Sequence, residues 1–126
     1  MSMIYPHVLV QAAKAYFHAG KPEQAQTHLD TAMQLSLTRH YRQLTAIAQR
    51  LQGRIWQARS RFEEAQPCFE GSLAKRQAID DVIEYARTEE AYWLFFLARD
   101  DEGDGERGRK LLERARETFR RLGVNG

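Results

Sequence analysis

Hydrophobic residues recur every three or four positions along most of the chain, the spacing of one buried face of an α-helix. The first such stretch runs to Gly20, Lys21 and Pro22, which are typical of a tight turn, and a second stretch follows it. The whole pattern predicts an all-α fold with no strands. Its six helices are expected near residues 7–19, 22–36, 41–59, 63–77, 80–99 and 106–122.

The order of small and large residues repeats after 40 residues: Gly53 takes the place of Ala13, and Trp56 that of Tyr16. Further equivalents are Ala25 and Ala65, Leu29 and Phe69, Ala32 and Ser72, and Met33 and Leu73. A looser third copy places Gly108, Leu112 and Ala115 43 residues after their counterparts. We therefore expect one domain, 1–126, of three helix-turn-helix units near residues 6–39, 41–79 and 80–122.

Pro67 lies within the fourth expected helix and has no backbone N–H to donate. In the first turn of a helix that N–H has no intrahelical acceptor, so we predict that this helix begins near Glu63 or Glu64. Both carboxylates also suit the positive end of the helix dipole.

This order of residues resembles the tetratricopeptide repeat, which has small residues at repeat positions 8, 20 and 27. The first unit fits best when counted from Pro6, and the second, counted from Ala46, departs at Gln49 and Gln52. The 40-residue spacing and the stretch 111–123 look like the longer-period repeats of large bacterial signalling ATPases, cyclases and transcription regulators. The resemblance implies a superhelical array of six antiparallel helices that serves as an interaction scaffold.

Composition and targeting signals narrow the class of protein. The 126 residues are 43% hydrophobic and 29% charged, as in a globular domain. The single cysteine, Cys68, cannot form an internal disulfide, and residues 1–20 lack the pattern of a signal peptide. The longest apolar run, residues 91–98, is too short to span a bilayer. We expect a cytoplasmic protein with no membrane segment.

Charge is segregated along the chain. Six arginines and no carboxylate lie between residues 31 and 62, whereas residues 80–104 hold nine carboxylates and two arginines. Arginine favours planar, bidentate contacts with carboxylates or phosphates. Arg50 and Arg54 are four residues apart, so they project from one face of the third expected helix.

The resemblance implies a concave groove lined by the first helix of each repeat. The candidate ligand-binding residues are Lys14, Phe17, His18, Arg50, Arg54 and Gln57, with His7, Val10, Ile47 and Ala58 beside them. Such a groove suits a protein or peptide segment that carries carboxylates. It is partly similar to the two-carboxylate clamp of chaperone-binding relatives, but that clamp uses asparagines and this chain has none before Asn125. The alternative is that Arg50 and Arg54 are solvated or pair with glutamates of a neighbouring helix.

Residues 100–111 imitate two ligand sites. Gly103 to Gly108 match G-x-G-x-x-G, but a dinucleotide site requires parallel strands around it. Asp100, Glu102 and Asp104 fall at calcium-loop positions, but Leu111 stands where the bidentate glutamate is needed. We interpret the segment as a lengthened, solvated turn and expect no metal and no cofactor.

Catalytic chemistry has little support in the sequence. His7, His18, His28 and His40 lack the spacing of metal ligands, and Cys68 has no base near it in the sequence. We interpret Cys68 as an inert buried thiol and the chain as a protein that is not an enzyme.

The fifth expected helix is apolar around its whole circumference at residues 91–98, so we expect it to be covered on all sides. Only one helix follows it here, whereas such arrays usually end in a polar capping helix. We therefore predict that the last repeat docks onto a second copy or onto more of a parent protein. The residues expected to do so are Trp93, Phe96, Leu112 and Phe119. The alternative is that arginine stems of the last helix shield it.

Two functions of different classes follow. The first is a non-catalytic interaction module that binds a protein or peptide segment in the basic groove. The second is a structural or oligomerisation piece of a larger bacterial signalling protein. Nucleic-acid binding by residues 39–61 is a distant third, because the net charge is only +2 and the acidic stretch shares the domain.

Overall fold

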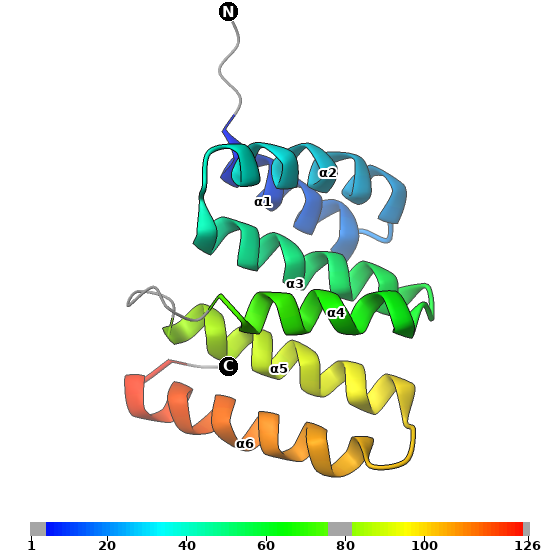
Figure 1. Ribbon diagram of the computed structural model, residues 1–126, viewed down its shortest axis with the longest axis vertical. Helices are drawn as coiled ribbons and strands as arrows, with labels where there is room; N and C mark the ends of the chain where they lie inside the picture. The colour runs from blue at the N-terminus through cyan, green and yellow to red at the C-terminus, as the bar shows by residue number, and fades with distance from the viewer. Residues whose placement is uncertain (1–4, 76–81, 125–126) are drawn as a thin grey trace, which may run out of the picture.

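The computed structural model describes residues 5–75 and 82–124. These residues form six helices and no strand, which confirms the all-α prediction. The helices are α1 (Pro6–His18), α2 (Pro22–Thr38), α3 (Arg42–Ala58), α4 (Phe62–Leu73), α5 (Val82–Arg99) and α6 (Asp104–Leu122). Figure 1 shows them stacked as three antiparallel pairs, with α1 and α2 at one end and α6 at the other.

Two predicted helix limits need correction. The fourth helix ends at Leu73, and residues 76–77, which were expected to continue it, lie outside the described residues, as do 80–81 before α5. The sixth helix begins at Asp104 and not at residue 106. None of the helices in the described ranges combines the length and the hydrophobicity that crossing a bilayer requires.

Pro67 lies beyond the first turn of α4, contrary to the prediction. The helix begins at Phe62, one residue earlier than expected, so Pro67 is its sixth residue. At that position the missing N–H deprives the carbonyl of Glu63 of its intrahelical donor. Glu63 and Glu64 do lie in the first turn, as predicted.

Small residues let the paired helices approach closely. Ala13, Ala25, Ala32 and Ala65 are completely buried. At Gly53 an added Cβ would lie 2.9 Å from the Phe69 ring, so this site of α3 requires glycine for the ring of α4 to fit. The third pair reverses the arrangement, because Trp93 occupies the place of Gly53 on α5 and packs on Gly108 of α6, where a Cβ would lie 3.1 Å from Trp93.

Gln49 and Gln52, the two departures from the repeat pattern, have polar partners. The amides of Gln26 and Gln52 exchange two hydrogen bonds of 2.6 and 2.9 Å and so join α2 to α3. Lys75 Nζ donates to Gln49 Oε1 at 2.7 Å. Satisfied polar contacts replace the apolar ones that the repeat pattern leads one to expect.

The turns at Gly20 and Ser60 each contain a residue with positive φ, and so does the connection that begins at Asp100. Around the connection from α5 to α6 the chain has three more residues than around the connection from α3 to α4. One of them lengthens the end of α5, one lengthens the turn, and one lengthens the start of α6. As a result α5 keeps the 40-residue register of α1 and α3, while Gly108 of α6 lies 43 residues after Ala65. The register of the fifth helix, which its all-round apolar pattern leaves undetermined, is thereby set.

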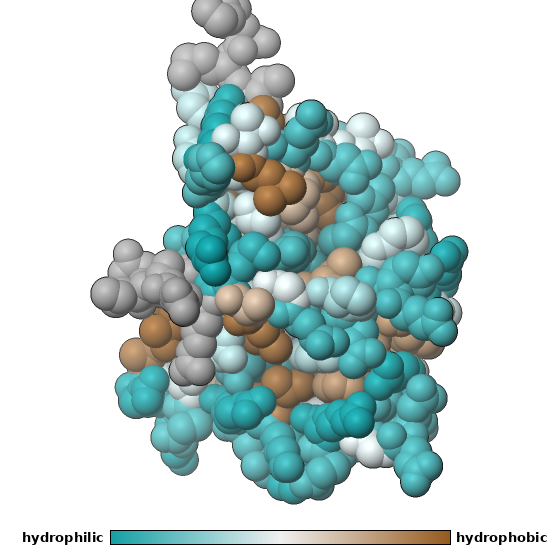
Figure 2. Space-filling view, viewed as in Figure 1, coloured by the Kyte–Doolittle hydropathy of each residue, from teal (hydrophilic) through white to brown (hydrophobic). Residues whose placement is uncertain are grey.

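Within the described residues the fifth helix is not covered on all sides, and whether another molecule covers the rest stays a prediction. Leu94 and Leu97 are 42% and 52% exposed, whereas Phe95 and Phe96 are buried. The opposite wall of this last core is α6, which is strongly amphipathic and buries Leu111, Ala115 and Phe119. In Figure 2 the α6 end of the visible face is covered mainly by hydrophilic residues. α6 is therefore itself the polar outer layer of this end of the array.

Candidate functional site

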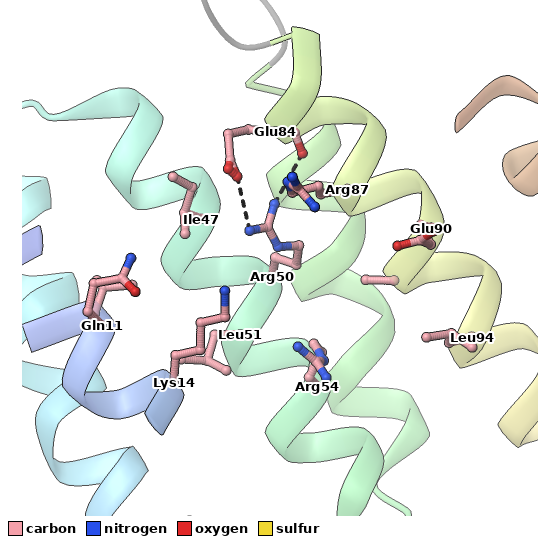
Figure 3. Close-up of a pocket in the computed structure, with 12 residues that line it drawn as sticks. Gln11, Lys14, Ile47, Arg50, Leu51, Arg54, Glu84, Arg87, Glu90 and Leu94 are labelled. Carbon is pink, nitrogen blue, oxygen red and sulfur yellow. Dashed lines mark hydrogen bonds and ion pairs between the residues drawn. The ribbon is translucent and has the colours of Figure 1, made fainter. Parts of the chain in front are cut away.

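A groove of about 460 Å³ runs between α1, α3 and α5, the first helices of the three pairs. The residues that line it fall into rows whose members are 40 residues apart. One row is Val10, Arg50 and Glu90, and the next is Lys14, Arg54 and Leu94. Val10, Leu51 and Ala91 are its buried lining residues. The close-up in Figure 3 shows these side chains projecting from the three helices.

Arg50 is paired inside the groove. One guanidinium nitrogen lies 3.2 Å from the Glu84 carboxylate, and the other donates to the Glu84 carbonyl at 3.1 Å (Figure 3). The second nitrogen also donates to Thr88 at 3.4 Å. Its side chain is only 13% exposed. Arg50 thus joins α3 to α5, and the alternative of pairing with a neighbouring glutamate is the one observed for this residue.

Arg54 has no such partner. Its guanidinium lies over the Phe17 ring, 5.1 Å from the centroid, and it makes no ion pair with any residue that the structure describes. Burial lowers the pKa of Arg54, and the charge of Arg50 lowers it further. The stacking fixes the position of the guanidinium while its charge remains uncompensated.

Lys14 adds a charge to this positive region from α1, and His18 adds a titratable ring. Neither makes an ion pair within residues 5–75 and 82–124. Desolvation lowers the pKa of His18, and the charges of Arg54 and Lys14 lower it further. Three cationic or titratable side chains therefore face one another at the C-terminal ends of α1 and α3, and an anion placed among them would relieve their repulsion.

Among the other predicted groove residues, Val10 and Ile47 also line the groove, whereas Phe17, His18 and Gln57 are not among its lining residues. Phe17 flanks the groove and supports Arg54. Gln57 is partly buried, and its Oε1 has no hydrogen-bond partner among the described residues. His7 lines a separate hollow of about 390 Å³ with Tyr41 and Ile47, at the N-terminal ends of α1 and α3. Of the six candidate ligand-binding residues, Lys14, Arg50 and Arg54 therefore line the groove itself.

The α5 wall was missing from the sequence prediction. Glu84, Arg87, Glu90 and Leu94 all line the groove. The 40-residue repeat could have identified them, because Arg87, Glu90 and Leu94 each follow a lining residue of α3 by 40 residues. Glu84 lies one helical turn before Arg87. It could not be used while the register of this helix was undetermined.

The segment 100–105 is not arranged as a calcium loop. Asp104 is 1% exposed and binds Arg99 through two hydrogen bonds of 2.7 and 2.8 Å. It also accepts the backbone N–H of Asp101 at 2.9 Å. These bonds, more than the burial that opposes them, hold the pKa of Asp104 below its ordinary value. The predicted lengthened turn is present, but Asp104 is not solvated and its oxygens are already occupied.

Groups associated with catalysis are not assembled in the described ranges. No cluster of three or more His, Cys, Asp or Glu residues there could hold a metal ion. Burial raises the pKa of the Cys68 thiol, whose Sγ lies 3.4 Å from the carbonyl of Glu64. A thiol that stays protonated is a poor nucleophile.

Two of the four residues predicted to dock another molecule are buried. Phe96 and Phe119 are each 4% exposed and pack within the chain. Trp93 and Leu112 are partly exposed, so only these two could contact another molecule without rearrangement. The docking role itself remains a prediction.

Comparison with known proteins identifies the fold family. The sequence profile of the tetratricopeptide repeat family matches residues 6–78, more than half of the chain, covering the first two helix pairs. Searches of curated proteins and of solved structures find no match. Members of this family are typically non-catalytic scaffolds that mediate protein–protein interactions. The chain belongs to the tetratricopeptide repeat family.

Proposed function

We propose that this protein is a non-catalytic interaction module that binds a segment of a partner protein in the groove between α1, α3 and α5. The observation that supports this most is the pair Lys14 and Arg54, two groove cations without a carboxylate partner among the described residues. A cation that served only structure would be paired as Arg50 is, or fully hydrated. Arg54 is instead half-buried and held against Phe17.

The groove suits a polypeptide better than a small molecule. It is open, is lined by three helices, and carries both charged and apolar side chains in each of its rows. Recognition of an extended or helical segment uses such a surface, because successive side chains of the segment meet successive rows.

The test is selection of binding peptides from a displayed library of random segments, followed by mapping of the site by heteronuclear NMR. Shift changes should concentrate on the groove faces of α1, α3 and α5. The variant Lys14→Gln with Arg54→Gln should lose binding. The matched control is Arg107→Gln with Lys110→Gln, which removes the same charges from the exposed face of α6. Binding that maps to α2, α4 and α6, or that the control weakens equally, would refute the groove assignment.

A further inference from the structure

The cations of the groove are not equivalent. The charge of Arg50 is neutralised by Glu84, and its three hydrogen bonds leave it little freedom. Arg54, four residues later, is stacked on Phe17 and has no anion among the described residues. An incoming anion therefore meets Arg54 without having to displace an existing partner. Because the guanidinium is already immobilised, little side-chain entropy is lost on binding.

The part of the groove beside Arg54 is positive on two helices. Lys14 reaches from α1 toward α3 (Figure 3), and His18, one turn further along α1, is close enough for its pKa to respond to both Arg54 and Lys14. No carboxylate of the described residues pairs with any of the three. A planar, bidentate acceptor such as a carboxylate fits the fork of Arg54.

The facing wall on α5 has a different character. Leu94 lines the groove and is 42% exposed, and Leu97, three residues later on the same side of the helix and just beyond the lining residues, is 52% exposed. Glu90, one turn before Leu94, turns its carboxylate toward the groove (Figure 3). Beside Leu94 this wall therefore offers apolar contact area and repels a second anion, whereas Arg87, one turn before Glu90, makes the other end of the wall cationic.

We infer that the occupant is a protein segment that presents a carboxylate side chain to Arg54 and Lys14 and a bulky aliphatic side chain to Leu94 and Leu97. This inference rests on the proposed function and adds the chemistry and the orientation of the segment. The acidic residue lies on the α1–α3 side, and Glu90 repels it from the part of α5 beside Leu94. Arg54 and Leu94 are the specificity-determining residues of the two subsites, and Arg50 is a positioning residue that holds α5 in place.

The experiment uses short synthetic peptides with the full chain. The parent peptide carries an acidic pair and a leucine pair in a glycine-serine background, with the spacing between the pairs varied. Two derivatives replace Glu with Gln or Leu with Ser, and a third adds Glu directly beside the leucines. Affinities are measured by NMR titration against the wild type and the variants Arg54→Gln, Leu94→Ser and Glu90→Gln, with Arg107→Gln as control. Circular dichroism verifies that each variant is folded.

The expected result is a pattern of coupled losses. Replacing Glu with Gln in the peptide should weaken binding about tenfold to the wild type and to Arg107→Gln, but not to Arg54→Gln. Replacing Leu with Ser in the peptide should weaken binding to every protein except the Leu94→Ser variant. Glu beside the leucines should weaken binding to the wild type, and Glu90→Gln should restore it.

Two failures are distinguishable. If peptides bind in the groove but the Glu and Gln forms have equal affinity, or Arg54→Gln weakens both forms equally, the inferred chemistry is wrong and the proposed function stands. If neither these peptides nor any member of the displayed library shifts resonances of α1, α3 and α5, both are wrong.

Discussion

The buried ion pair between Asp104 and Arg99 should dominate the stability of the last helix pair. Asp104→Ala removes three hydrogen bonds, leaves the Asp101 N–H without this acceptor, and leaves Arg99 with only Gln66 and a 3.5 Å contact to the exposed Asp101 carboxylate as polar partners among the described residues. Loss of one partner of a buried pair costs about 3–5 kcal/mol. Arg99 is 17% exposed, keeps its bond to Gln66 and stacks on Phe95, so the low end of that range applies.

We therefore expect Asp104→Ala to lower the free energy of unfolding by about 3 kcal/mol and the melting temperature by about 10 °C. Asp104→Asn, which retains an acceptor, should cost about half as much. Urea unfolding followed by circular dichroism and tryptophan fluorescence measures the difference. Because repeat arrays can open one unit at a time, hydrogen exchange of α6 should be compared with that of α1.

The matched control is Glu106→Gln, which changes an exposed carboxylate in the same helical turn. Its pairing with Arg109 is a surface contact, so the cost should stay below about 0.5 kcal/mol. The pair also predicts a pH dependence. Because the folded-state pKa of Asp104 is lowered, its stabilisation is present above the unfolded-state pKa and is lost as the pH falls through the folded-state value. Equal stability of Asp104→Ala and Glu106→Gln at neutral pH would refute the reasoning.

Three further predictions concern glycine packing, the groove and the end of the array. Gly53→Ala should lower the free energy of unfolding, measured by urea denaturation, by about 1 kcal/mol, because the buried Phe69 ring leaves no room for the added methyl group. The control Gly105→Ala places its methyl group in open space and should be neutral or stabilising. Equal destabilisation by both substitutions would contradict this. The affinity for an acidic peptide, measured by NMR titration at several pH values, should rise as the pH falls through the titration range of His18, because a bound anion favours the protonated ring and raises its lowered pKa. In His18→Gln the affinity should depend less on pH. The alternative that α6 shields the last repeat predicts that sedimentation over a concentration series gives the monomer mass of 14.7 kDa. A stable dimer would contradict it and favour docking of the last repeat onto a second copy.

The sequence predicted the fold well because the small residues of the repeat are set by close approach between helices. Gly53 could be assigned to a helix seam from the repeat pattern alone, since it takes the place of Ala13 while Phe69, whose ring it accommodates, takes the place of Leu29. The limits of helices were less predictable. Pro67 favoured a later start of α4, but the close packing of Phe62 on Phe95 extends the helix to Phe62.

The candidate site was predictable on α1 and α3 but not on α5. Arg50 and Arg54 look equivalent in sequence, and only the position of Glu84, a contact between residues 34 apart, separates the paired arginine from the unpaired one. Similarly, the role of Asp104 depends on Arg99 lying across a turn that a linear pattern describes as solvated. Which charged side chains pair between helices depends on how the helices pack, so the local sequence pattern does not predict it.

The constant 40-residue step of the groove helices makes the recognition surface modular. Lys14, Arg54 and Leu94 occupy one row, so each repeat contributes one side chain to it, and exchanging that side chain alters one subsite only. The extra residues between α5 and α6 lie outside these rows and leave their alignment unchanged. New specificities could therefore be grafted row by row, with the alanine and glycine seams between helices left as they are.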